Sequence, residues 1–564
     1  MKTSDTLKYI AAFIAAAATA SASGQTLSTE ITVDRTITPV ETSAAPLGTV
    51  RPSVLRPSAL GTSLSISEFD GSVLYPASVF ETAPSLSDGL PEPSPYRGYA
   101  TLGYFPVYNL GAQVGYRLID NSRTLLGASA GFGGQSWNAH GVERSMTMSD
   151  NAIGVQAHLR QHFGAHRLEV KADYTHTALK SPSVRFDEQT QAFNSFRASA
   201  SFGRAAVRYS YRIAAAVDRL GASKPVLGYS RSYEASANTL VKGSLSGAYY
   251  SSDGRIGGEL AVDASHMHRS GTEVYPLAVL AYTAPKYSGT TVATVTPAFV
   301  YRSPSLRLRL GLALDIVDSA DCSNLAVRPA VSASWTPTGR FAAYVRADGG
   351  TDFNSLRRRF DYSPFVNPFA VSELRRTPVR AELGLHYGGT GGFRAGFSAG
   401  YTVTDGAAMP VASTVVCFLP VDLKLLWAKL SLGYKFDWMN LDISANARFN
   451  QGGFAHADPD SPDRARFVAD IAAKARPIEP LAVGIGWELR ASRSCYTAAA
   501  LGGDTDARLN LSNVSDLHLD ATYAFSDRLS AGLEVRNMLC RRPEILPGLP
   551  MPGLHGLLSA TIRF

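Results

Sequence analysis

The feature that most constrains the fold of this chain is a period-two alternation of apolar and polar residues, which recurs from Gly98 to the end of the sequence. It is clearest in the segment 306–316, LRLRLGLALDI, where every second residue is leucine or isoleucine. Successive side chains of a β-strand point to opposite faces, so this segment has one wholly apolar face and one polar or small face. The same division recurs in segments 168–174, 207–213, 341–346 and 517–525.

Three further features favour a membrane barrel over a soluble β-sandwich. The alternating segments run for about 9–13 residues, which is longer than the strands of soluble sheets and suits tilted strands that cross a bilayer. Very short turns alternate with long polar loops. Aromatic residues gather near the short turns, as an interfacial girdle requires; they include Trp335, Tyr434, Phe436, Trp438, Tyr523 and Phe525.

The number of short turns predicts the number of strands. Ten turns joining 20 strands, with both chain ends on the same side of the membrane, require about 22 strands, provided that Thr272–Tyr287 is a loop excursion. The sheet should close on itself, because an open edge in lipid leaves backbone groups without hydrogen-bond partners. The ten turns are expected at 121–122, 163–165, 203–204, 252–254, 303–305, 336–339, 388–392, 437–438, 478–480 and 526–527. The predicted fold class is therefore all-β, a large transmembrane antiparallel barrel.

The beginning of the chain is typical of an exported protein. Lys2 and Lys8 precede an alanine-rich apolar run, and small residues follow this run. Residues 1–22 are therefore interpreted as a signal peptide. No later apolar run reaches the roughly 18 residues of a membrane helix. The formal net charge is +7. In an exported chain this charge does not favour nucleic acid as a partner, and basic residues are expected to line the lumen or meet the phosphates of outer-membrane lipid.

Residues 23–97 differ from the barrel segment 98–564 in composition. Nine prolines interrupt them and no alternation is sustained, which indicates an extended Pro-rich periplasmic segment. Its one β-prone run is Glu30-Ile31-Thr32-Val33, a possible partner-binding strand that would add to the sheet edge of a periplasmic energy-coupling or scaffold protein. The alternative is an ordinary stretch of linker.

The sequence carries none of the common motifs of catalysis or metal binding. The chain has no GxSxG elbow and no HExxH, and its Gly-rich run at 131–134 lacks the lysine of a phosphate loop, so we nominate no catalytic residue, cofactor or metal ligand and expect no enzyme. The four cysteines show no metal spacing and leave their pairing open. Arg357, Arg358 and Arg359, in a long loop expected from Thr351 to Pro378 that also contains Arg375 and Arg376, form either an anion-contact loop or a solvated one.

The C-terminal strand, HGLLSATIRF, alternates and ends on an aromatic residue. Its Ile562 and Phe564 resemble the terminal signal by which outer-membrane barrels are recognised by the barrel assembly machinery. The preceding VRNMLCRR and PGLPMPG, at 535–542 and 547–553, together with this strand resemble the end of TonB-dependent receptor barrels, which have 22 strands. Those receptors carry a plug of about 150 residues, and no recognisable plug precedes this barrel.

The resemblance implies an outer-membrane receptor for uptake or transport of a solute across the cell outer membrane. The alternative is a non-transporting barrel that anchors or scaffolds a periplasmic or surface partner through its Pro-rich segment. The two hypotheses differ in what occupies the lumen, because a barrel of 22 strands is wide and must be open, filled by loops or filled by another protein.

Overall fold

The computed structural model describes residues 96–564 except for the segments 107–108, 140–145, 182–188, 207, 225–236, 271–288, 320–322, 339, 363–373, 390, 413–416, 437–440, 453–464, 498–507, 542–543, 547–548 and 551. The predicted signal peptide, the Pro-rich segment, the strand Glu30–Val33 and the excursion Thr272–Tyr287 lie outside the described residues. Among the residues described, no helix is long and apolar enough to cross a membrane.

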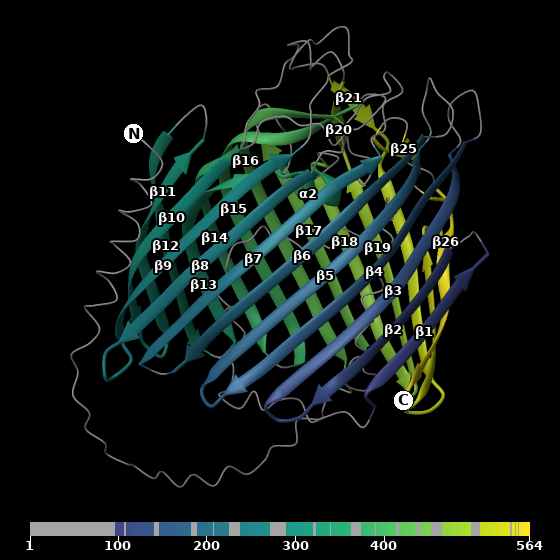
Figure 1. Ribbon diagram of the computed structural model, residues 1–564, viewed down its shortest axis with the longest axis horizontal. Helices are drawn as coiled ribbons and strands as arrows, with labels where there is room; N and C mark the ends of the chain where they lie inside the picture. Colours follow the sequence, from purple (N-terminus) through teal and green to yellow (C-terminus); the bar gives the residue numbers. More distant parts are fainter. Residues whose placement is uncertain are drawn as a thin grey trace. The chain divides into compact units, whose positions relative to one another are not determined.

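The described chain forms a closed antiparallel β-barrel of 22 strands (Figure 1), as the turn count predicted. The first eleven wall strands are β1 (Gly98–Phe105), β2 (Asn109–Asp120), β3 (Thr124–Ala139), β4 (Met146–Phe163), β5 (His166–Ser181), β6 (Gln189–Ala205), β7 (Tyr209–Lys224), β8 (Ala237–Tyr250), β9 (Ile256–Ser270), β10 (Thr290–Arg302) and β11 (Leu306–Asp318). The other eleven are β12 (Ser323–Thr338), β13 (Phe341–Phe353), β14 (Leu374–Gly389), β15 (Gly391–Ala412), β16 (Cys417–Phe436), β17 (Leu441–Gly452), β18 (Phe467–Ile478), β19 (Leu481–Ala491), β22 (Val514–Ala524), β23 (Leu529–Arg536) and β26 (His555–Arg563).

Each wall strand pairs with the next along the chain, and β26 pairs with β1 to complete the circle. β9 and β10 pair directly, so no wall strand is inserted between them. Four shorter strands lie outside the wall: β20 (Arg493–Thr497) and β21 (Arg508–Leu511) form a hairpin between β19 and β22, and β24 (Glu544–Leu546) pairs with β25 (Leu549–Pro550). The one described helix is α2 (Leu356–Tyr362), between β13 and β14.

The two faces of β11 illustrate how the sequence pattern produces the barrel. Leu310 and Leu312 are 45% and 56% exposed. Their neighbours on the other face include Arg309, which forms an ion pair with Glu259 on β9 at 2.9 Å. Apolar side chains that a soluble protein would bury therefore face outward, while charged side chains pair inside. The alternation of this segment is inverted relative to a soluble protein because lipid surrounds the sheet.

The short turns that the structure describes occur between the strand pairs where the sequence placed them, with one clear error of position; the turn expected at 437–438 lies outside the described residues. Gly203 and Arg204 lie inside β6, and the connection to β7 comes after Ala205; there the Ala206 N–H donates to the Tyr209 carbonyl at 3.1 Å. Gly203 is a strand residue whose missing side chain leaves space for the adjacent strand, because a Cβ there would lie 2.5 Å from the carbonyl oxygen of Tyr211. The glycine therefore marks a close approach of two strands rather than a turn.

The long loop expected from Thr351 to Pro378 is also shorter than the sequence indicated. β13 continues to Phe353 and β14 begins at Leu374, so Arg375 and Arg376 belong to a strand. The polar residues at these strand ends hid the strand pattern, because strands of this barrel extend beyond the apolar band at the loop end.

Aromatic pairs flank the short turns. The rings of Tyr434 and Phe436 are 4.4 Å apart between centroids, and those of Tyr523 and Phe525 are 4.9 Å apart. Tyr523 and Phe525 are also exposed on the outer face. This is the arrangement expected of a girdle at the interface between lipid and water.

The seam between β1 and β26 closes the barrel through the last residue. The Gly98 N–H donates to the Phe564 carbonyl at 2.7 Å, and the Phe564 N–H donates to the Gly98 carbonyl at 2.9 Å. The ring of Phe564 occupies the space beside Gly98, where a Cβ would lie 2.4 Å from a ring carbon. It also stacks on Tyr116 of β2 with 6.4 Å between centroids. Ile562 is exposed on the same outer face.

The orientation of the wall predicts opposite effects of one substitution at two adjacent residues of β6. Ala198 shares the outward face with Phe196, and Ser199 faces the lumen with Arg197, which pairs with Asp173. Ala198→Arg should destabilise the inserted barrel by about 2–4 kcal/mol or block assembly, because it exposes a charge to acyl chains. Ser199→Arg should be tolerated. The fraction of heat-modifiable, folded protein on gels measures this, and equal tolerance of both variants would contradict the facing.

The seam predicts that Phe564 contributes to assembly through both its backbone and its ring. Deletion of Phe564 removes two hydrogen bonds and the ring contact with Tyr116, so we expect less inserted barrel and more degradation by periplasmic proteases. Phe564→Tyr should assemble normally, because it keeps the ring and the backbone. Quantitative immunoblots of outer-membrane fractions test this, and normal levels of the deletion variant would refute a role of this residue in assembly.

Candidate functional site

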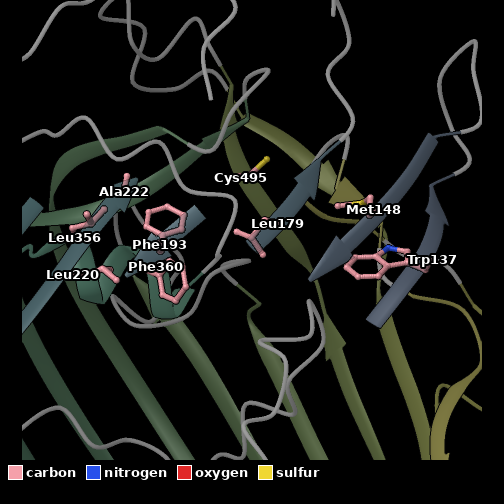
Figure 2. Close-up of a cluster of buried hydrophobic side chains, with 9 residues drawn as sticks. All are labelled: Trp137, Met148, Leu179, Phe193, Leu220, Ala222, Leu356, Phe360 and Cys495. Carbon is pink, nitrogen blue, oxygen red and sulfur yellow. The ribbon is translucent and has the colours of Figure 1, made fainter. Parts of the chain in front are cut away.

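The loop end of the lumen is where chain segments from several parts of the barrel meet. Nine buried apolar residues gather there (Figure 2), contributed by β3 to β7, by α2 and by β20. We call this set the mouth cluster; it consists of Trp137, Met148, Leu179, Phe193, Leu220, Ala222, Leu356, Phe360 and Cys495. Ala408 of β15 and Leu511 of β21 pack against it. Apolar residues on the lumen face of a barrel have no lipid to meet, so they must pack against chain that enters the lumen.

Helix α2 is the element that enters from the β13–β14 connection. Ser355 precedes its first residue, and the Ser355 hydroxyl accepts a hydrogen bond from the Arg358 N–H at 3.2 Å, as an N-cap does. Leu356 and Phe360, four residues apart, lie on one face of the helix. In Figure 2 the ring of Phe360 lies against Phe193 of β6, edge to face, with 4.8 Å between centroids.

An ion pair holds the polar side of α2 to the same wall. The Arg357 guanidinium lies 3.0 Å from the carboxylate of Asp218 on β7, and it also donates to the hydroxyl of Ser195 on β6. Both charged side chains are largely shielded, at 15% and 26% exposure. Asp218 and Leu220 are two residues apart and both lie on the lumen face of β7. The same strand therefore provides the charged and the apolar contact for the helix.

The hairpin β20–β21 reaches the mouth cluster from the other half of the barrel. Strand β20 of the hairpin pairs in parallel with β15. In this pairing Val411 lies opposite Tyr496, and Ala412 lies opposite Thr497. Arg493 at the start of β20 is fully buried, and its guanidinium donates to the carbonyls of Ser512 at 2.7 Å and Glu544 at 2.9 Å. Arg493 therefore ties the base of the hairpin to β24, and the pairing with β15 holds its side to the wall.

Asp150 of β4 lies on the lumen face two residues from Met148 of the mouth cluster. The side chain is fully buried, and among the described residues neither carboxylate oxygen has a hydrogen-bond partner. In the register of the sheet its neighbours are Gln135 and Leu179. Burial of a carboxylate without a partner is unfavourable. Such a group is retained where it serves function more often than where it serves stability, so Asp150 belongs to the candidate site.

Below the mouth, the lumen wall is lined by ion pairs between neighbouring strands. Arg328 of β12 binds Asp315 of β11 through two nitrogens, at 2.8 and 3.0 Å. Arg380 of β14 binds Asp348 of β13 at 2.8 Å. In each pair the two opposite charges of neighbouring strands offset one another, so these four side chains add no net charge to the lumen wall.

The residues proposed from sequence are separated in the structure. Arg357, Arg358 and Arg359 lie in α2; Arg357 binds Asp218, and Arg359 is 3% exposed. An anion could reach Arg357 only by displacing Asp218, so the anion-contact role stays a prediction. Phe564 and Ile562 lie at the seam, and Glu30–Val33 lie outside the described residues. Among the residues described, no group of three or more His, Cys, Asp or Glu side chains could hold a metal ion.

Sequence reasoning missed Phe193, Leu220, Phe360 and Asp150. The sequence did indicate that Leu220 is unusual. Leu220 lies two residues from Asp218 and so on the same lumen face of the strand, where polar residues are expected. The same anomaly applies to Leu179 on β5. What could not be read was the partner, because α2 lies more than a hundred residues away in sequence.

Comparison with solved structures identifies the fold. The chain superposes on a mutant of the ferric enterobactin receptor of Pseudomonas aeruginosa in complex with enterobactin, with a TM-score of 0.62 and 11% identity over 84% of this chain and 82% of that one. The superposition on the FrpB iron transporter of Neisseria meningitidis has a TM-score of 0.62 and 12% identity, over the same 84% of this chain and 82% of that one. For the ferric-catecholate import receptor Fiu of E. coli K12, in a closed form, the TM-score and the identity are 0.59 and 10%, again over 84% and 82%.

No family model and no curated protein matches the sequence. At this identity the likeness shows the fold alone, which is that of a TonB-dependent receptor-like barrel. The resemblance inferred from the C-terminal motifs is thereby confirmed for the barrel.

The contacts of α2 predict that Asp218 stabilises the closed arrangement of the mouth. Asp218→Asn should lower the free energy of local opening of α2 by about 1.5–3 kcal/mol, the usual contribution of a charged hydrogen bond. Arg358→Ala is the control, because its pair with Asp352 is longer, at 3.4 Å, and more exposed, and should contribute at most about 1 kcal/mol. Amide hydrogen exchange of residues 355–361 measures both. Faster exchange in the Arg358 variant than in the Asp218 variant would reject this anchor.

Proposed function

We propose that this protein is a cell outer-membrane receptor that takes up a solute, and that the solute first engages the mouth cluster. The observation that carries the proposal is the inward-folded mouth, where α2 and the β20–β21 hairpin meet across the lumen face of β3–β7. The structural neighbours of this barrel are named as a ferric enterobactin receptor, an iron transporter and a ferric-catecholate import receptor. A passive pore has no need of an apolar layer in its lumen. A receptor does, because a bound solute must be held before it passes.

The solute class that we propose is a ferric chelate with aromatic groups. The structural neighbours are named as receptors or transporters of ferric compounds. In this structure α2 and its neighbours bury the rings of Trp137, Phe193 and Phe360, so in this proposal they bind planar aromatic groups only when α2 opens. Below the mouth, the charged side chains of the lumen wall are paired with one another. A polar complex could therefore pass without being held strongly by an unpaired charge.

A solute that is bound at the mouth must be released before it can be taken up. In this proposal the release needs a source of energy from the periplasmic side. We propose that Glu30–Val33 supplies the coupling by adding as a strand to a periplasmic energy-coupling protein, so that backbone hydrogen bonds provide much of the affinity. Thr32→Pro removes one backbone donor and fixes φ, whereas Thr32→Val keeps both the donor and the β propensity.

The experiment is uptake of ⁵⁵Fe-enterobactin by cells that lack their own ferric-catecholate receptors and express this protein. We expect accumulation above the empty vector, a loss of at least tenfold in Thr32→Pro at unchanged surface level, and normal uptake in Thr32→Val. Asp150→Asn should change uptake while the barrel stays folded.

A second readout separates the two functions that the sequence left open. Photo-crosslinking from positions 29–34 in intact cells should capture an energy-coupling protein. Capture of a different periplasmic protein, together with no accumulation above the vector, would overturn the receptor proposal in favour of an anchoring barrel.

A further inference from the structure

The outer face of β7, β8 and β9 carries ionisable residues near its loop end, where the rest of that face is apolar. Arg219 of β7 lies opposite Thr239 of β8, and Thr239 lies opposite His268 of β9. One step closer to the turns, His266 of β9 is hydrogen-bonded to Thr291 of β10, with 2.9 Å between the ring Nδ1 and the hydroxyl. We call Arg219, Thr239, His266 and His268 the outer basic patch.

The outward orientation of the patch follows from its neighbours in the strands. Arg219 stands between Asp218 and Leu220, and both of these contact α2 inside the lumen. Beside His268, Met267 is buried in a separate lumen cluster with Val292, Val317 and Phe353. Since side chains alternate, Arg219 and His268 point to the opposite side, and both are exposed.

The height of Arg219 can be derived from the girdle at the turn end. Tyr211 marks that interface on β7, where its hydroxyl binds the ring of His166 at 2.8 Å. Arg219 is eight residues further along, roughly 26 Å of strand at about 3.3 Å per residue, or about 20 Å along the membrane normal for a tilt of about 40°. The apolar band is about 25 Å tall, so the Arg219 Cα lies in its upper part, and a long side chain can extend to the head groups.

A charge at this position needs a partner. Arg219 forms no ion pair or hydrogen bond with any residue that the structure describes, whereas Arg197, Arg328 and Arg357 on the lumen side each bind a carboxylate. In its row across the sheet, Arg219 is flanked by Phe196 and Thr239. Among the described residues of β6 to β11, the outward carboxylate in this region is Asp318, which lies beyond Thr291 on β11. The partner that such an arginine meets from lipid is the phosphate of a head group.

We propose that the outer basic patch is a binding site for the phosphate of an outer-leaflet lipid. Arg219 supplies the charge and a planar pair of donors, while Thr239 and His268 supply further hydrogen-bonding groups beside it. This site is on the outside of the wall and depends on membrane placement only, so it is independent of the proposed solute uptake.

The test is retention of a phosphorylated glycolipid by the folded, full-length protein. The barrel is placed in phosphatidylcholine nanodiscs that contain a small fraction of lipid A, or of dephosphorylated lipid A, and lipid retained after release into detergent is counted by native mass spectrometry. We expect the protein to retain lipid A and not its dephosphorylated form. Arg219→Gln should reduce retention about fivefold, which corresponds to the roughly 1 kcal/mol of one basic residue near an anionic surface.

Two variants make the result specific. Arg212→Gln is the matched control, because Arg212 is an exposed arginine of the same strand on the lumen face, and its retention should equal the wild type. Arg219→Lys keeps the charge and should retain more lipid A than Arg219→Gln. Equal retention of the two lipid forms by the wild type, or equal loss in Arg212→Gln and Arg219→Gln, would overturn the proposal, and the first of these outcomes does not depend on any variant folding.

Discussion

The structure depends on one constraint, which is that every backbone N–H and C=O within lipid must find its partner inside the protein. The pairing of β1 with β26 meets this constraint, because it leaves no open edge in the wall of 22 strands. The two hydrogen bonds between Gly98 and Phe564 extend the pairing to the last residue. Without closure the edge strands would lie in lipid unpaired, and neither an inside nor an outside would exist.

Closure also determines where polar chemistry is possible. Leucines such as Leu312 meet acyl chains outside, while charged residues gather in the lumen and pair between strands, as Arg328 does with Asp315. Two groups of residues depart from this division. Apolar side chains of the mouth cluster face the lumen, where they pack on α2, and Arg219 faces outward near the head groups. The mouth cluster packs on α2, and for Arg219 we have proposed a lipid phosphate as the partner, so each departure is a candidate for function.

The wall could be predicted from sequence because its signal is local. The alternation in 306–316 and the spacing of turns reflect strand geometry within a dozen residues, and they led to 22 strands and to the correct faces. The turn at Gly203 was misplaced, since a glycine that permits close strand approach looks the same in sequence as one that permits a turn. Arg357 could not be assigned to Asp218, because their contact joins residues 139 apart. The site was thus less predictable than the fold, for it is built from long-range contacts of loops.

The central claim is that the wall separates lipid from a paired, hydrated lumen. It is tested most directly by spin labels placed singly at every residue from 306 to 318 of β11 in reconstituted protein, with collision rates measured for molecular oxygen and for a polar nickel chelate. Oxygen accessibility should peak at the even positions, such as Leu310, and accessibility to the chelate should be higher at the odd positions, such as Arg309. Equal accessibility to the chelate at odd and even positions would contradict a membrane-spanning barrel with this orientation.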